Sequence, residues 1–246
     1  FQTKAYEIPA ASRTSKGRAV HNFLEFPTTE NVSAIISYSD KAVGFLVMVT
    51  QDGLVKKTPL SDFLNIRRSG IIAIALKKDD HLKWVKLSGG KDQVLLATSL
   101  GQSIRFKESQ IRAMGRTAAG VKAIRLKKSD HVAAFDIIKE AEAGSPKSYT
   151  VLVVMGNGFA KQTVLGEYKV QSRGGSGIKT AHITPKTGNL VASKIIHEEK
   201  EILALSAKGQ VIRTELKSVR NTGRSTQGVR IMNLKAGDRL IGVVVI

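Results

Sequence analysis

The side chains with the clearest chemical potential in this sequence are lysines and arginines that recur at equivalent positions. One group follows a series of turn glycines by three or four residues: Lys56, Lys57, Arg105, Lys161 and Arg213. A second group surrounds a second series of glycines: Arg13, Lys16, Arg18, Arg67, Arg68, Arg116, Lys122, Arg173, Lys179, Arg224 and Arg230. Such cations bind polyanions, and their repetition in phase predicts a belt of positive charge around the folded chain. The alternative is that they only keep exposed strands soluble.

A glycine-rich segment is the sharpest local feature. It consists of Gln171, Ser172, Arg173, Gly174, Gly175, Ser176 and Gly177. Three glycines in five residues permit backbone conformations in which N–H groups converge on a phosphate oxygen, and Arg173 and Lys179 flank the segment with positive charge. A flexible loop between strands is the alternative interpretation. The segment is not a P-loop, because the Gly-Lys-Ser/Thr ending is missing.

The sequence predicts no catalytic residue, metal site or cofactor. His81 and His131 each follow an aspartate at the same position of a repeat, which indicates a role in turns. No His-x-His or His-Glu-x-x-His spacing suggests a metal, and no tyrosine has surroundings that would make it a nucleophile. The absence of cysteine excludes disulfides, thiolate nucleophiles and zinc–sulfur sites, and it fits a reducing cytosol.

The charge balance indicates a polyanionic partner. The 246 residues include 39 lysines and arginines but 20 aspartates and glutamates, for a net charge of +19. Nucleic acid is the favoured polyanion, ahead of an acidic membrane or an acidic protein. Few aromatic side chains are present to stack on bases, which argues against single-stranded ligands. No apolar run approaches the roughly 20 residues that span a bilayer, so we expect that the protein is not embedded in a membrane. With the absence of cysteine, we expect it in the cytoplasm.

The glycines define the elements that must position these cations. Turn glycines recur about every fifty residues, at Gly53, Gly101, Gly158 and Gly209. A second series of glycines recurs in the same phase, at Gly17, Gly70, Gly120, Gly177 and Gly228. We expect a single domain of five repeats, approximately 1–40, 41–90, 91–140, 149–198 and 199–246. An insertion at 141–147 has the composition of a loop.

Each repeat is predicted to contain four short strands. In the third repeat they are expected at about 94–98, 103–107, 121–126 and 132–138, with turn residues between them. Four strands per repeat and no convincing helix predict an all-β fold of propeller-like blades, each of four antiparallel strands. A single blade cannot bury both faces, so the repeats must stack. An array of β-sandwiches is the structural alternative.

Three motifs resemble one known family. The stretch Tyr6-Glu-Ile-Pro-Ala-Ala-Ser-Arg-Thr-Ser-Lys-Gly17 resembles the opening of the second blade in C-terminal domains of DNA gyrase A. The segment 171–177 is similar to the gyrase A-box, a Gln-Arg-Arg-Gly-Gly-Lys-Gly pattern. The strand Gly53-Leu-Val-Lys-Lys-Thr58 matches a pattern that the family repeats.

The resemblance implies a six-bladed β-pinwheel, of which five repeats are visible, that wraps double-stranded DNA around its basic rim. It also implies support of negative supercoiling by a type II topoisomerase, in partnership with the gyrase A catalytic core and gyrase B. The isolated domain is expected to be monomeric and without a catalytic residue. A C-terminal domain of topoisomerase IV, or a propeller scaffold for acidic proteins, are the alternatives.

The sequence departs from the family pattern at the box. The box-like segment lies in the fourth visible repeat rather than the first, and Ser172 and Ser176 stand where the family has Arg and Lys. The first residues are neither a signal peptide nor a natural start. We therefore expect a fragment of a longer chain, with a first blade that carries the true box upstream.

Overall fold

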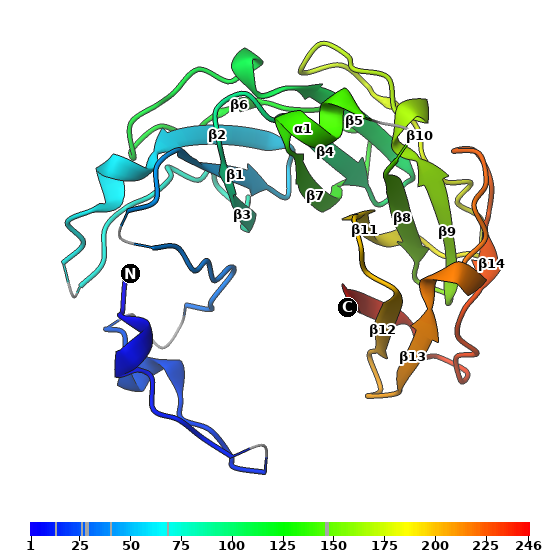
Figure 1. Cartoon of the computed structure of the whole chain (residues 1–246), viewed down its shortest axis with the longest axis horizontal. Helices are drawn as coiled ribbons and strands as arrows, with labels where there is room; N and C mark the ends of the chain where they lie inside the picture. The colour runs from blue at the N-terminus through cyan, green and yellow to red at the C-terminus, as the bar shows by residue number, and fades with distance from the viewer. Residues whose placement is uncertain (13, 26, 28–29, 40, 68, 146–147) are drawn as a thin grey trace.

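The chain curves into an open arc of small β-sheets. The computed structural model describes residues 1–12, 14–25, 27, 30–39, 41–67, 69–145 and 148–246. The sheets stand side by side along the arc, and the two termini face one another across its opening (Figure 1). No helix among the described residues is long and apolar enough to cross a membrane.

The secondary structure is almost entirely β. The strands are β1 (Phe45–Thr50), β2 (Leu54–Pro59), β3 (Leu82–Ser88), β4 (Gln93–Thr98), β5 (Gln102–Lys107), β6 (Val121–Lys122), β7 (Val132–Ile138), β8 (Thr150–Met155), β9 (Phe159–Val164), β10 (Ile178–Lys179), β11 (Leu190–Ile196), β12 (Glu201–Ser206), β13 (Val211–Glu215), β14 (Val229–Arg230) and β15 (Leu240–Val245). The helices are 3₁₀ turns and one short α-helix: η1 (Ala5–Glu7), η2 (Val20–Asn22), η3 (Leu60–Phe63), η4 (Glu108–Gln110), η5 (Leu165–Glu167), η6 (Leu216–Ser218) and α1 (Glu140–Gly144).

The strands form four antiparallel sheets that run from the inside of the arc to the outside. From inside to outside, the first three sheets are β3-β1-β2-β6, β7-β4-β5-β10 and β11-β8-β9-β14, and the fourth is β15-β12-β13. The all-β fold and the four-stranded antiparallel blades predicted from the sequence are confirmed for the first three sheets. Each sheet is called a blade below.

One predicted strand belongs to a different blade. The segment expected at 121–126 was assigned to the blade of its own repeat, and this assignment is wrong. Only β6 forms a strand there, and it pairs with β2 of the preceding blade, with Leu54 opposite Lys122. β10 pairs with β5, and β14 with β9, in the same way. The last three repeats thus each supply the outermost strand of the blade before them, which links successive blades through backbone hydrogen bonds.

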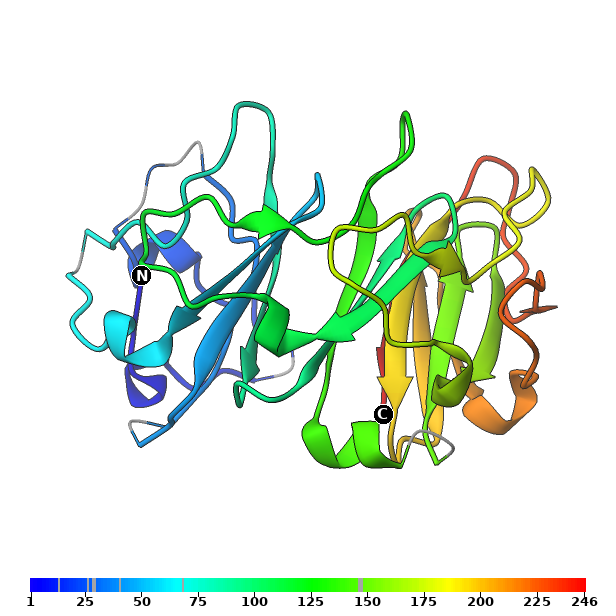
Figure 2. The same cartoon turned by 90° about the horizontal axis from the view of Figure 1, so that it is seen from above.

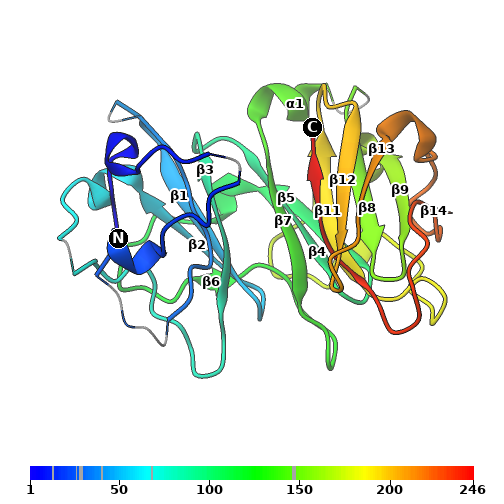
Figure 3. The same cartoon turned by 90° about the horizontal axis from the view of Figure 1, so that it is seen from below.

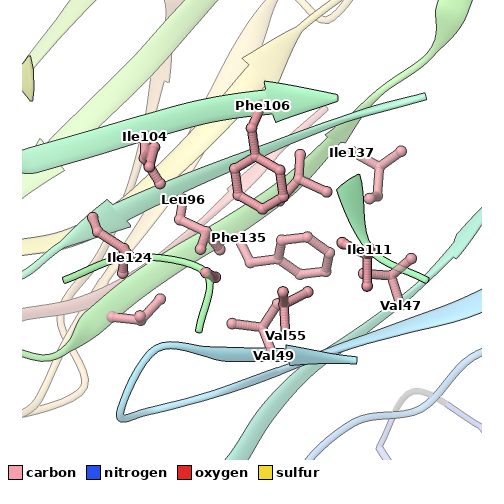
Figure 4. Packing of buried hydrophobic residues seen from close by; sticks show 13 residues of the cluster. Val47, Val49, Val55, Leu96, Ile104, Phe106, Ile111, Ile124, Phe135 and Ile137 are labelled. Carbon is pink, nitrogen blue, oxygen red and sulfur yellow. The ribbon is translucent and has the colours of Figure 1, made fainter. Parts of the chain in front are cut away.

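The apolar runs of the central strands are continuous because both faces of a blade are buried. On β4, Val94 and Leu96 pack into the core between the first and second blades, whereas Leu95 and Ala97 pack into the next core. Figure 4 shows the first of these cores, where Phe106 and Phe135 lie among aliphatic side chains from both blades. Alternate side chains of a strand point to opposite faces, so a strand between two cores has no polar face.

The two ends of the arc lack this double burial. The fourth blade has three strands, and its outward face leaves Leu205, Val211 and Val244 exposed. The first repeat, expected at 1–40, forms η1 and η2 but no strand among its described residues. The insertion expected as a loop at 141–147 instead begins as α1, because Glu140 and Ala141 start a run of good helix formers; residues 146–147 lie outside the described residues.

Candidate nucleic-acid interface

The outermost strands place a cation at the same point of three consecutive blades. β6, β10 and β14 lie on the convex side of the arc, and in each the second residue is basic and exposed. These residues are Lys122, Lys179 and Arg230. We call β6, β10 and β14 the crossing strands, because each passes from its own repeat to the blade before it. The segments that carry them run along the outside of the arc in Figure 2. Three of the predicted belt residues are therefore brought into one series along the rim.

A glycine precedes each of these strands because the chain passes close to the backbone of the blade before it. Gly177 has a φ of +71°, and a Cβ there would lie 2.4 Å from the carbonyl oxygen of Ser103. At Gly228 the φ is +78° and the nearest atom, the carbonyl oxygen of Ala160, would lie at 2.3 Å. Only glycine allows both the left-handed conformation and this approach.

Arginine side chains link each crossing strand to the loop that leads to the next one. The Arg173 guanidinium donates to the carbonyl oxygen of Lys122, and its Nε donates to that of Gln110 at 3.1 Å. One repeat later, Nη1 of Arg224 donates to the carbonyl oxygen of Lys179 at 2.8 Å. Both side chains are half-buried, so each guanidinium joins two blades and still reaches the rim surface. The arginine at the equivalent position of the preceding repeat is Arg116, also half-buried.

A third series was not identified from the sequence. Arg112, Lys169 and Arg220 are exposed and follow η4, η5 and η6 at the same distance before the second glycine of each repeat. An alignment of the three loops on that glycine would have found them. Their side chains extend the basic rim beside the crossing strands.

The face of the arc shown at the top of Figure 2 carries further lysines. The loops before β3, β7 and β15 protrude on this side, and α1 lies on the opposite side in Figure 3. Lys77 and Lys78 lie in the first loop, Lys127 and Lys128 in the second, and all four are exposed. These loops therefore add exposed positive charge on one face of the arc, beside the rim.

Four predicted belt residues are buried, so the expectation that they lie on the surface is wrong. Lys56, Lys57, Arg105 and Lys161 are all at most 6% exposed. Their strands β2, β5 and β9 are second from the outside, where the neighbouring blade and the incoming loop cover both faces. The exposed cations lie on the next strand along the chain, on β6 after β5 and on β10 after β9.

Two of these buried cations join adjacent blades. Nζ of Lys57 lies 3.4 Å from the Glu108 carboxylate and the same distance from the Glu108 carbonyl oxygen. Nη1 of Arg105 donates at 3.2 Å to the carbonyl oxygens of Leu165 and Tyr168 in the next repeat. Burial alone lowers the pKa of Arg105. The carbonyl oxygens of Glu108 and Leu165 also accept backbone N–H groups, from Ile111 and Tyr168, so each cation adds a second donor at the 3₁₀ turn of its neighbour.

Lys56 and Lys161 hold the loops that lead to the crossing strands. Nζ of Lys56 donates to the carbonyl oxygens of Arg116 and, at 2.6 Å, of Ala73. Nζ of Lys161 donates to those of Arg224 and, at 2.8 Å, of Gly223. Burial lowers the pKa of both lysines from 10.5 to about 8, because the charged form loses its hydration.

The remaining predicted residues are exposed but dispersed. Arg213 on β13 is bound to Glu201, with Nε at 2.9 Å from the carboxylate. Lys16, Arg18 and Arg67 are exposed and lie outside the sheets. Arg13 and Arg68 lie outside the described residues.

The box-like segment forms the loop before β10, and its N–H groups are partly used within the protein. The N–H of Arg173 donates to Oε1 of Gln110 at 2.7 Å, and that of Gly174 to the carbonyl oxygen of Ala123 at 2.8 Å. The N–H of Gln171 donates to the carbonyl oxygen of Arg105 at 2.7 Å. These three N–H groups dock the loop on its neighbours in the preceding repeat, so they do not point at a phosphate. Ser172 and Ser176 are exposed, and Gly175 and Gly177 are half-buried.

A metal centre is not formed by the part of the chain that the structure describes. No three histidine, aspartate or glutamate side chains lie close enough together there to hold a metal ion. The exposed lysines and arginines of the rim can bind anions.

Comparison with known proteins gives one family. Residues 1–20, 44–88, 92–139, 156–196 and 200–246 match the family described as DNA gyrase C-terminal domain, beta-propeller. The chain is 41% identical over 248 residues to the DNA gyrase A protein of Mycolicibacterium smegmatis, a match that covers 99% of this chain and 28% of the relative. It is 40% identical over 240 residues to the DNA gyrase A protein of Staphylococcus epidermidis, a match that covers 97% of this chain and 26% of the relative. The chain thus spans little more than a quarter of these proteins.

Solved structures share the fold. The C-terminal domain of DNA topoisomerase IV matches with a TM-score of 0.84 at 24% identity, over 94% of this chain and 70% of that one. A DNA gyrase A C-terminal domain matches with a TM-score of 0.73 at 21% identity, over 89% of this chain and 75% of that one. At these identities the likeness concerns the arrangement of blades.

Proposed function

Because the chain belongs to the DNA gyrase C-terminal domain family, we propose that it binds double-stranded DNA along its convex rim and bends it. The observation that carries this proposal is the series Lys122, Lys179 and Arg230, one exposed cation at the same point of three consecutive blades. A duplex that follows the arc meets each of them in turn. Contacts of this kind reach phosphates rather than base edges, so the binding has little sequence preference.

The rim has to offset the cost of bending. Turning about 40 base pairs through roughly 180° costs on the order of 10 kcal/mol for a smooth elastic rod. A partly solvated ion pair contributes about 1 kcal/mol, so about ten such contacts balance the bend. The crossing-strand cations, the arginines behind them and the series at Arg112, Lys169 and Arg220 supply contacts of this number on three blades.

In the longer protein, this domain supports negative supercoiling by a type II topoisomerase. Its partners there are DNA, the gyrase A catalytic core and gyrase B, and it contributes no catalytic residue or cofactor of its own. The isolated domain is a monomer that acts on nucleoid DNA in the bacterial cytoplasm. The curated relatives named above are gyrase A proteins, which favours gyrase over topoisomerase IV. The +19 charge favours DNA over an acidic protein.

The salt dependence of binding tests the rim directly. A variant with Lys122→Gln, Lys179→Gln and Arg230→Gln removes three rim charges. Lys83→Gln, Lys91→Gln and Lys200→Gln remove three exposed charges elsewhere. Fluorescence anisotropy with a labelled duplex gives the slope of log K against log salt. The rim variant should lose about 2 to 3 units of slope, since each phosphate contact contributes about 0.9. Equal losses in both variants would overturn the proposal.

A further inference from the structure

Two buried lysines carry charge that the fold does not need for packing. Lys56 and Lys161 are 0% exposed, and neither lies within 4 Å of a carboxylate among the described residues. In the second and fourth blades the same position, three residues after the turn glycine, holds Ile104 and Ile212. An isoleucine therefore suffices there, and burying an ammonium group in its place costs free energy.

Both ammonium groups lie directly under the basic loops. Each donates to the backbone carbonyl of a rim arginine, Arg116 above Lys56 and Arg224 above Lys161. The second donation goes to Ala73 from Lys56 and to Gly223 from Lys161, in the segments that pack over them.

The charged groups that face Lys56 are Asp62 and Arg116, and those that face Lys161 are Glu167 and Arg224. In each pair the carboxylate favours the charged lysine and the arginine opposes it. Burial outweighs both of these effects. A nearby anion on the arginine side would remove the opposing influence and favour the charged form.

We propose that Lys56 and Lys161 are positioning residues for DNA, which hold Arg116 and Arg224 toward the rim and attract the duplex by charge without touching it. This inference rests on the proposed function. Solvent screens a buried charge less than a surface charge, so its field reaches phosphates above the loop.

The proposal has a consequence that a purely structural lysine would not produce. Both lysines are partly uncharged near pH 8, and bound phosphates draw a proton onto them. DNA binding at pH 8 to 9 is then accompanied by proton uptake, and the affinity falls as the pH rises. If binding raises the pKa of each lysine by about half a unit, the loss is about threefold per lysine.

The test measures DNA affinity and proton uptake at constant ionic strength between pH 7 and 9. Anisotropy of a labelled duplex gives the affinity, and calorimetry in two buffers of different ionisation enthalpy gives the protons. Because the titration is incomplete at both ends of this range, the wild-type chain should lose about sixfold in affinity and take up protons. Lys56→Met and Lys161→Met together should abolish both effects.

Lys194 provides the matched control. Burial also lowers its pKa, but it lies on β11 at the inside of the arc, near Lys86, Asp136 and Glu199. Lys194→Met should keep the wild-type pH dependence. If Lys194→Met removes that dependence as fully as Lys56→Met and Lys161→Met together, the proposal is wrong.

The wild-type measurement decides the matter even where a variant fails to fold. Binding without proton uptake, and with an affinity independent of pH, overturns this inference and leaves the proposed function intact. Absence of binding at pH 7 and moderate salt overturns both.

Discussion

Nη1 of Arg224 donates a hydrogen bond of 2.8 Å to the backbone carbonyl oxygen of Lys179, which belongs to the preceding repeat. Arg173 makes the same contact with Lys122 one repeat earlier. The guanidinium that strengthens the rim charge is thus also a tie between the crossing strands. Binding and architecture are coupled in these two side chains.

Removing either arginine side chain should weaken DNA binding and the stability of the fold together. Arg173→Ala and Arg224→Ala are each expected to lower DNA affinity at 0.1 M salt by about tenfold, through one lost phosphate contact and a looser crossing. Each should also lower the free energy of unfolding by about 1 kcal/mol. Anisotropy and urea denaturation measure the two effects. Arg213→Ala, which removes an exposed pair with Glu201 on the last blade, should leave the free energy of unfolding almost unchanged because solvent screens the pair. Larger effects at Arg213 than at Arg224 would contradict this interpretation.

The glycine before each crossing strand should be irreplaceable. Gly228→Ala places a Cβ 2.3 Å from the Ala160 carbonyl oxygen in a left-handed conformation, so β14 should detach from β9. The expected loss is about 2 to 3 kcal/mol in the free energy of unfolding. Gly115 has open space around its Cβ position and no positive φ, so Gly115→Ala should be neutral or slightly stabilising. Thermal denaturation of the two variants gives the comparison, and similar melting temperatures would show that the close approach does not matter.

Shortening a side chain on a strand that is buried on both faces should destabilise the protein far more than the same change at the open end of the arc. Leu96→Ala leaves a cavity in the core between the first two blades and should cost about 3 kcal/mol. Leu205→Ala lies on the exposed face of the fourth blade, where the side chain is 41% exposed, and should cost less than about 1 kcal/mol. Urea denaturation midpoints test this difference. A Leu205 variant as unstable as the Leu96 variant would mean that the last face is covered in solution.

Stability should rise with pH between 7 and 9. Lys56 and Lys161 have a pKa of about 8 in the folded chain and an ordinary value of 10.5 when unfolded. Between these values the unfolded chain binds more protons than the folded one, so raising the pH favours the folded state. The melting temperature should therefore increase by a few degrees, and Lys161→Met should remove about half of the increase. A melting temperature that falls over this range, with the fall retained in the variant, would contradict the assignment. This rise has the opposite sign to the expected fall in DNA affinity, which separates the two roles of the lysines.

The repeat, the blades and the basic rim could be predicted from the sequence because each has a local signal. Gly53, Gly101 and Gly158 mark tight turns, and the apolar runs beside them mark strands. The partner of a strand is not local information. Val121 and Lys122 have the same pattern whether they pair with their own repeat or with β2 of the preceding blade.

Burial of the cations could not be read from composition either. Lys56 and Lys122 both follow a glycine closely and both belong to short β-strands, yet one is buried and the other exposed. The difference arises because Lys56 is on the second strand from the outside and Lys122 is on the outermost one. Position in the sheet, set by the crossing of the chain between blades, decides which lysine reaches solvent.

Bending is the central claim, and energy transfer between dyes at the two ends of a duplex of about 40 base pairs tests it most directly. Titration with this chain should raise the transfer efficiency at saturation, because the duplex follows the arc from Lys122 to Arg230. The variant that lacks the charges of Lys122, Lys179 and Arg230 should show a smaller rise at saturation, whereas Lys83→Gln, Lys91→Gln and Lys200→Gln should leave it unchanged. Saturated binding of the wild-type chain with no rise in transfer would contradict the account.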